Sequence, residues 1–149
     1  MATARVAAEP ARIPLGRALG LRERAQLIGE VVVAYVRARQ ELRQAPIETA
    51  VARLRRGRDG DGRNGPEALA EAARLGRIVV RTLAFLPGDT RCLRRSLVLT
   101  QLLARRGISG RLVIGARTAP DFLAHAWVEH DGIPVLSPEG DSFGRLVEL

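Results

Sequence analysis

The chain has 149 residues, a length that fits one domain, and its 46% hydrophobic and 27% charged residues indicate a globular protein rather than a disordered one. Its formal net charge is +8, and every basic residue is an arginine. Aromatic residues make up only 3%, so the side chains that stack single-stranded bases are scarce. We therefore expect no nucleic-acid binding, while an acidic peptide or protein partner stays compatible with the charge.

Several other classes are excluded by features that the sequence lacks. Cys92 is the single cysteine, so no internal disulfide can form, and one cysteine with two histidines gives no zinc-binding pattern. The longest apolar run, over 31–36, is far shorter than the roughly 20 residues that cross a bilayer, and the first residues hold no apolar signal-peptide core. We expect a cytoplasmic protein with no cofactor, no metal and no membrane partner.

The first half of the chain is predicted to be largely helical. Two prolines and a glycine make residues 1–18 a loose arm. Apolar side chains then recur at a helical period over 19–45, and a short second helix over 47–56 follows Pro46. The apolar stripe of the first helix is either core or a docking face, and core is the simpler interpretation. Its members are Leu21, Ile28, Val31, Val32, Tyr35 and Leu42.

Two more helices are predicted before any strand. Glycines and acidic residues make 57–66 a flexible loop, and the apolar positions of 67–86 share one helical face. Thr90 is a candidate N-cap for a helix over 91–106, which Gly107 would close at its C-terminal end.

The last third of the chain changes to strand patterns. Asp131-Gly132 is a strong signal for a hairpin turn, and Pro134 favours a sheet edge for the strand that follows. Helices followed by an antiparallel sheet define an α+β fold. The predicted strands cover 109–118, 122–130, 133–137 and 142–149. We divide the chain into a loose arm, an N-terminal helical part and a core domain, over 1–18, 19–65 and 66–149.

Cys92 falls in the first turn of the helix predicted over 91–106. Backbone N–H groups and the helix dipole favour an anion at a helix start, and three neighbouring arginines add positive potential. These effects favour the thiolate over the thiol, so Cys92 is a candidate nucleophile. The alternative is a small buried apolar residue, the usual role of a lone cysteine.

His125 lies on the strand predicted over 122–130, among apolar neighbours. A neutral imidazole near Cys92 could take the thiol proton and later protonate a leaving amine. Alone, such a histidine is more often a core residue. A nucleophile at a helix start followed by a base on a strand is, however, the arrangement of papain-like and transglutaminase-like cysteine enzymes.

The side chains of this strand alternate between two faces. His125, Trp127 and Glu129 fall on one face, and small apolar residues fall on the other. Trp127 is therefore either a wall of the site or a core aromatic. Glu129 lies about 13 Å along the strand from His125, too far to orient the imidazole. His130 abuts the turn, where we expect it to be solvated.

Several motifs occur in order over residues 75–149. The stretch "CLRRSL" opens a helix that ends at "GI", "LVIG" follows in a strand, and "AHAWVEHDG" leads into the turn. This order resembles the leader peptidase of lasso peptide biosynthesis. The resemblance implies a transglutaminase-like core that acts as a papain-type cysteine endopeptidase on a ribosomally made precursor peptide. It also implies a separate small leader-binding protein and an ATP-using lasso cyclase as partners.

The resemblance assigns Cys92 as the nucleophile and His125 as the general base. The third member is usually an aspartate twelve positions after the histidine, where this chain has Ser137. A hydroxyl can orient the imidazole but cannot stabilise imidazolium as a carboxylate does, so Glu139 is the chemical alternative. A three-residue hairpin loop that starts at position 130 would set Ser137 opposite His125, and one that starts at position 131 would set Glu139 there.

Two other functions stay open from the sequence. The same fold could serve an acyl transferase or deamidase of the transglutaminase type, which would leave a cross-linked or deamidated product. The chain could also be a non-enzymatic peptide-binding module, which the missing carboxylate at position 137 favours. For peptide cleavage or acyl transfer, the backbone N–H of Cys92 is a candidate donor to the oxyanion.

Overall fold

A computed structural model describes the chain over residues 19–56, 62–87, 91–119, 121–136 and 143–149. The arm predicted over 1–18 lies outside the described residues. Within the described part, helices come first and strands follow, as predicted. The helices are α1 (Leu21–Gln44), α2 (Ile47–Arg55), α3 (Pro66–Leu83) and α4 (Cys92–Arg105). The strands are β1 (Arg111–Arg117), β2 (Leu123–His130), β3 (Ile133–Leu136) and β4 (Gly144–Glu148).

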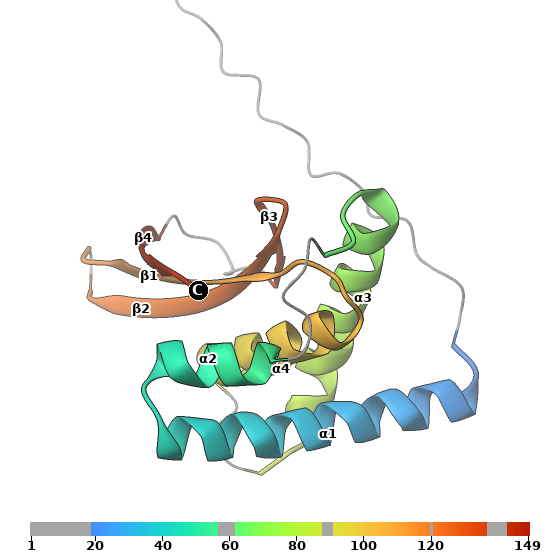
Figure 1. Cartoon of the computed structure of the whole chain (residues 1–149). Helices are drawn as coiled ribbons and strands as arrows, with labels where there is room; N and C mark the ends of the chain where they lie inside the picture. The colour runs from blue at the N-terminus through green and yellow to red at the C-terminus, as the bar shows by residue number, and fades with distance from the viewer. Residues whose placement is uncertain (1–18, 57–61, 88–90, 120, 137–142) are drawn as a thin grey trace, which may run out of the picture.

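The helices pack against one side of an antiparallel sheet whose strand order is β3-β2-β1-β4 (Figure 1). The α+β fold class is thereby confirmed. α4 lies at the centre, in contact with the three other helices and with β1 and β2, and residues 96–103 are buried without interruption. A helix covered on all sides is largely apolar, which the leucines of α4 provide, although Ser96, Thr100 and Gln101 are buried with them. Within the described residues, no helix combines the length and the apolarity that a membrane crossing requires.

The buried face of α1 differs in part from the predicted stripe. Val31 and Tyr35 are buried as expected, but Leu21 and Ile28 are 85% and 48% exposed. Ala34 and Ala38 complete the buried face, because small side chains let α1 approach the neighbouring helices closely. The N-terminal turns of α1 project past α3 (Figure 1), so their apolar side chains have little to pack against.

Both ends of α4 are defined by backbone geometry. The prediction of Thr90 as N-cap was wrong, because the N-cap is Arg91, whose extended backbone accepts a 3.2 Å hydrogen bond from the N–H of Arg95. Thr90 itself lies outside the described residues. At the other end, Gly107 has a φ of 63°, which ends the helix as predicted.

The hairpin between β2 and β3 turns on Asp131 and Gly132, which have φ values of 50° and 75°. Positive φ at both turn residues is typical of a two-residue type I′ turn. Neither three-residue loop considered from the sequence is therefore correct. A bulge beside Val128 then shifts the register by one, so Val128 pairs with Leu136, and β3 occupies the sheet edge that Pro134 predicted.

Candidate active site

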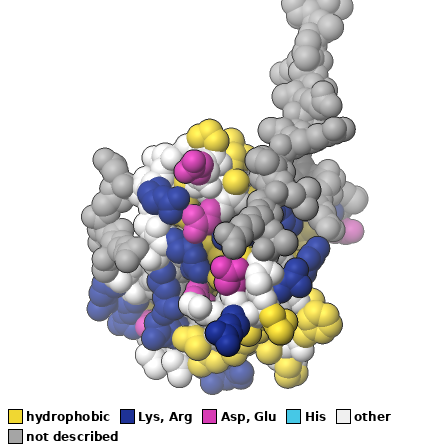
Figure 2. Space-filling view, turned by 90° about the vertical axis from the view of Figure 1, so that its right-hand side faces the viewer, with side chains coloured by type: hydrophobic (Ala, Val, Ile, Leu, Met, Phe, Trp, Pro, Cys, Tyr) yellow, Lys and Arg dark blue, Asp and Glu magenta, His cyan; other side chains and the backbone are white. Residues whose placement is uncertain are grey.

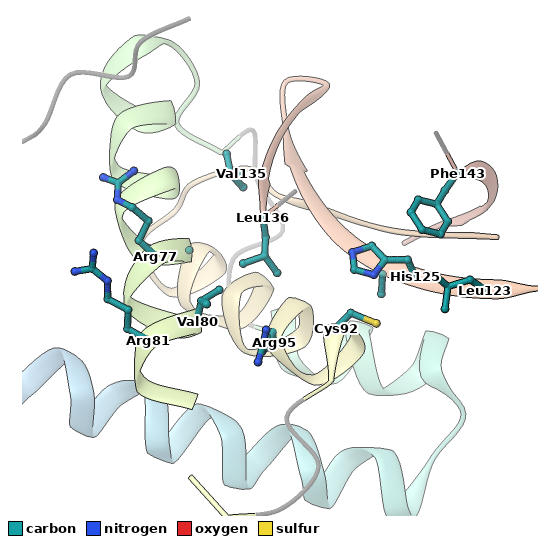
Figure 3. Close-up of a pocket in the computed structure, with 12 residues that line it drawn as sticks. Arg77, Val80, Arg81, Cys92, Arg95, Leu123, His125, Val135, Leu136 and Phe143 are labelled. Atoms are coloured by element: carbon teal, nitrogen blue, oxygen red, sulfur yellow. The ribbon is translucent and has the colours of Figure 1, made fainter. Parts of the chain in front are cut away.

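Cys92 is the first residue of α4, at the position predicted for a nucleophile. It is partly exposed and lines a pocket of about 550 Å³ between α3, α4 and the β2–β3 hairpin (Figure 3). Because Cys92 is only partly buried, it is accessible to a molecule that enters the pocket. A first-turn residue also lies among backbone N–H groups that have no partner within the helix.

Ser96 connects the start of α4 to β2. Its buried hydroxyl donates a 3.1 Å hydrogen bond to the carbonyl oxygen of Ala126. Cys92 lies one turn earlier, on the same side of α4, because residues four positions apart share a helix face. The Ser96 bond therefore holds Cys92 against the part of β2 that carries His125.

We expect Ser96→Ala to lower the free energy of unfolding by about 1–3 kcal/mol, because the buried carbonyl of Ala126 would lose its partner. For a domain of this size the thermal midpoint should fall by about 2–4 °C per kcal/mol. Circular dichroism melting measures the effect, with Thr49→Ala on the exposed face of α2 as the control. A midpoint change no larger than that of the control would contradict the account.

His125 lies on the face of β2 that was predicted, together with Trp127. Its ring stacks on Trp127 with centroids 6.2 Å apart and on Phe143 with centroids 5.3 Å apart. Ala126 and Val128 point to the other side of the sheet, into the core against the helices. The imidazole is thus held by aromatic contacts rather than by the helix layer.

Cys92 and His125 reach the same pocket from different layers of the fold. Among the described residues, β3 pairs only with the end of β2 that starts at Val128, so the β2 edge beside His125 has no described neighbour. The pocket opens along this edge, with Cys92 on its helix side and His125 on its sheet side (Figure 3). The two side chains form no hydrogen bond with each other within the described structure, and such contacts commonly tighten only when substrate binds.

Burial lowers the pKa of His125 below its ordinary value of 6.5. The imidazole is therefore neutral, and able to accept the thiol proton, at a lower pH than an exposed histidine would be. We expect kcat/KM to stay high at pH 6.5 and to decline only as the pH falls through the lowered pKa. A pH–rate profile measures this, and NMR titration of the His125 ring protons assigns the group. An acid limb centred above pH 6.5 would contradict the prediction.

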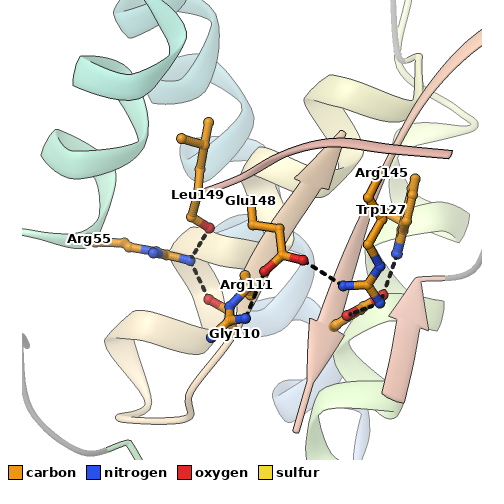
Figure 4. A network of polar contacts seen from close by, with 8 residues as sticks. Arg55, Gly110, Arg111, Trp127, Arg145, Glu148 and Leu149 are labelled. Atoms are coloured by element: carbon orange, nitrogen blue, oxygen red, sulfur yellow. Dashed lines mark hydrogen bonds and ion pairs between the residues drawn. The ribbon is translucent and has the colours of Figure 1, made fainter. Parts of the chain in front are cut away.

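A polar network joins the buried residues Trp127 and Glu129 to Arg145, which is exposed (Figure 4). The Nε1–H of Trp127 donates a 2.8 Å hydrogen bond to Oε1 of Glu129, whose carboxylate also accepts bonds of 2.8 and 3.0 Å from Arg145. Hydrogen bonding to Glu148 and the charge of Glu129 raise the pKa of Arg145. Sequence reasoning identified the shared face of Trp127 and Glu129 but missed the contact of both with Arg145, which comes from a distant strand.

The expectation for His130 was wrong. This residue is only 1% exposed, and its Nδ1 lies 2.7 Å from the carbonyl oxygen of Ser109, to which it donates. The alternation of β2 indicated this burial, because His130 lies on the same face of the strand as the core residues Ala126 and Val128. Nearness to a turn was the weaker guide, and His130 is a structural residue away from the pocket.

The third member of the predicted triad cannot be placed. Ser137 and Glu139 both lie outside the described residues. In the part of the chain that the structure does describe, no group of three or more histidine, cysteine or acidic side chains could hold a metal ion.

A family model described as the transglutaminase-like superfamily matches residues 32–148. The chain belongs to the transglutaminase-like superfamily. Comparisons with curated proteins and with solved structures found no match. Members of this superfamily are usually cysteine-dependent enzymes, and Cys92 is the only cysteine in this transglutaminase-like chain. The matched segment runs from within α1 to the end of β4 and contains every element that lines the pocket.

Proposed function

We propose that this transglutaminase-like protein is a cysteine peptidase that removes the leader from a ribosomally made precursor peptide, at one leader–core junction. The observation that carries the proposal is the position of Cys92 and His125 on opposite sides of one open pocket. The superfamily match and the order of the motifs "CLRRSL" and "AHAWVE" support it further. Lasso peptide maturation is the pathway that these motifs favour.

The reaction begins when His125 accepts the thiol proton and Cys92 Sγ attacks the carbonyl carbon of the scissile peptide bond. A C–S bond forms, and negative charge develops on the carbonyl oxygen, where the backbone N–H of Cys92 can donate a hydrogen bond. The C–N bond then breaks as His125 gives its proton to the leaving amine. Water, deprotonated by His125, attacks the thioester, which releases the acyl part as a carboxylic acid and restores the thiol.

A third residue would orient the imidazole, and Ser137 and Glu139 are the two candidates. Continued toward His125, the pairing of Val128 with Leu136 would set Glu139 opposite it, which is the register that the loop starting at position 131 would also have given. We expect Glu139→Gln to lower kcat more than Ser137→Ala does. Initial rates of both variants against the parent protein measure this, and a larger loss in Ser137→Ala would reverse the assignment.

The partners in this proposal are a small leader-binding protein, which presents the precursor, and an ATP-using lasso cyclase, which acts after cleavage. A presenting partner raises the effective concentration of the scissile bond at Cys92. Cleavage by the isolated chain should therefore be slow and should accelerate when the leader-binding protein is added.

The deciding experiment incubates the purified chain with precursor peptide and leader-binding protein and identifies the products by mass spectrometry. The proposal predicts a free leader and a free core peptide from one cut, and no product with Cys92→Ala. A deamidated or cross-linked peptide would contradict cleavage and show the acyl-transfer function instead. Binding of the precursor without any product would show that the chain is a peptide-binding module.

A further inference from the structure

The walls of the pocket around Cys92 differ in chemical character. On the helix side, Arg77 and Arg81 of α3 and Arg95 of α4 line it. On the sheet side, the lining includes the apolar side chains of Leu123 and Phe143 (Figure 3). Among the described residues that line the pocket there is no aspartate or glutamate. We call Arg77, Arg81 and Arg95 the arginine wall.

The arginine wall has no partner in the described part of the protein. The ion pairs found there involve other basic residues, such as Arg106 with Glu30 and Arg145 with Glu129. Arg95 also has a buried Nε that makes no hydrogen bond with the described residues. A buried N–H without an acceptor is unfavourable, and a bound ligand is one way to supply the acceptor.

The spacing of the arginine wall fits an extended peptide. Arg77 and Arg81 are four residues apart, so they lie on successive turns of one face, about 5–6 Å apart at Cβ. Alternate side chains of an extended peptide are about 7 Å apart, which is a similar repeat. Their stems line the pocket, and their guanidinium groups extend along the outer side of α3, away from Cys92 (Figure 3). A peptide that runs from Cys92 across α3 would pass over both charges.

The face shown in Figure 2 carries arginine side chains toward both of its sides, with acidic side chains between them, and the net charge of the whole chain is +8. Guanidinium groups bind carboxylates through paired N–H donors, and this geometry distinguishes a carboxylate from an uncharged amide of the same shape. The sheet side presents the apolar side chains of Leu123 and Phe143, and the guanidinium of Arg117 lies over the Phe143 ring, 5.9 Å from its centroid. Only the helix side has arginines that line the pocket, so the two sides favour different side chains.

We propose that the arginine wall selects peptides that carry an aspartate or glutamate on the side of the scissile bond that lies over α3. The proposal rests on the proposed peptidase activity for the direction of the peptide through the pocket. Acidic side chains pair with Arg77 and Arg81, and the opposite side of the scissile bond takes an apolar residue against Leu123 and Phe143.

The test uses short peptidyl epoxysuccinates, which alkylate Cys92 and carry peptide on both sides of the electrophile, so it covers both directions and does not depend on hydrolysis of any substrate. Matched probes carry glutamate or glutamine at one position at a time, and intact-mass spectrometry gives the alkylation rate. We expect the glutamate probe to react about tenfold faster than the glutamine probe at one position, the size of a charge-assisted hydrogen bond at a partly exposed site.

The double variant Arg77→Gln/Arg81→Gln should reduce this preference to less than about twofold, while Arg39→Gln on the exposed face of α1 should keep it. All variants should have the same thermal midpoint, since these arginines are exposed. Equal rates for glutamate and glutamine probes at every position would overturn the proposal, as would a preference that survives in the double variant. Selective alkylation without cleavage of a precursor would contradict the peptidase function and leave the arginine wall supported.

Discussion

Replacing Cys92 with alanine is expected to remove turnover, with kcat/KM at least about 1,000-fold lower, because the chain has no second thiol that could form an acyl-enzyme. His125→Ala should cost a similar factor, since the thiol would lose the group that accepts its proton. The double variant should be no worse than either single variant, because the two residues act as one unit. Steady-state rates on a precursor peptide measure all three.

Both single variants should keep the fold of the parent protein. Cys92 is partly exposed at the start of α4, and alanine removes only its sulfur atom. Unchanged circular dichroism and binding of the precursor would show that the loss is chemical. Additive losses in the double variant would contradict a shared role. Cleavage by Cys92→Ala at the parent rate would exclude Cys92 as the nucleophile.

The second large effect is expected at Glu129, which accepts a hydrogen bond from Trp127, the residue on which the His125 ring stacks. Glu129→Ala leaves the Nε1–H of Trp127, a residue that is 5% exposed, without its acceptor. An unsatisfied buried N–H costs about 1–3 kcal/mol, so the thermal midpoint should fall by several degrees. A less firmly held Trp127 should also lower kcat, because His125 stacks on its ring. Fluorescence of Trp127, the only tryptophan in the chain, reports both unfolding and local order.

Glu129→Gln is the matched control for that effect. Its amide oxygen can still accept the bond from Trp127, although it no longer carries the charge that pairs with Arg145. We expect Glu129→Gln to keep more of the stability and of kcat than Glu129→Ala. If both variants lose the same amount, the ion pair with Arg145 matters and the orientation of Trp127 does not.

Much of the fold follows from local patterns, and the reasons are visible in particular residues. The alternation of His125 and Trp127 with Ala126 and Val128 determines which face of β2 packs on α4. Two residues that accept positive φ specify the hairpin turn. The first turn of α4 was predicted closely enough to recognise Cys92 as a candidate nucleophile.

Other features could not be predicted because they depend on tertiary packing. The burial of α1 is set by where its neighbours lie, so Ala34 is buried while the larger Leu21 is exposed. The bulge beside Val128 shifts the β2–β3 register, and no local pattern marks its position. Arg145 reaches Glu129 from another strand, so their ion pair depends on sheet order. The arginine wall likewise combines residues of two helices that meet only in the fold.

The central claim is that Cys92 forms a covalent acyl-enzyme with a peptide substrate. The most direct measurement is intact-mass spectrometry of the protein, acid-quenched shortly after mixing with precursor peptide and leader-binding protein. We predict a transient mass increase equal to the acyl part of the cleaved peptide, located on Cys92 by fragmentation and absent from Cys92→Ala. Precursor cleavage without any adduct at any quench time, or an adduct on another residue, would contradict the account.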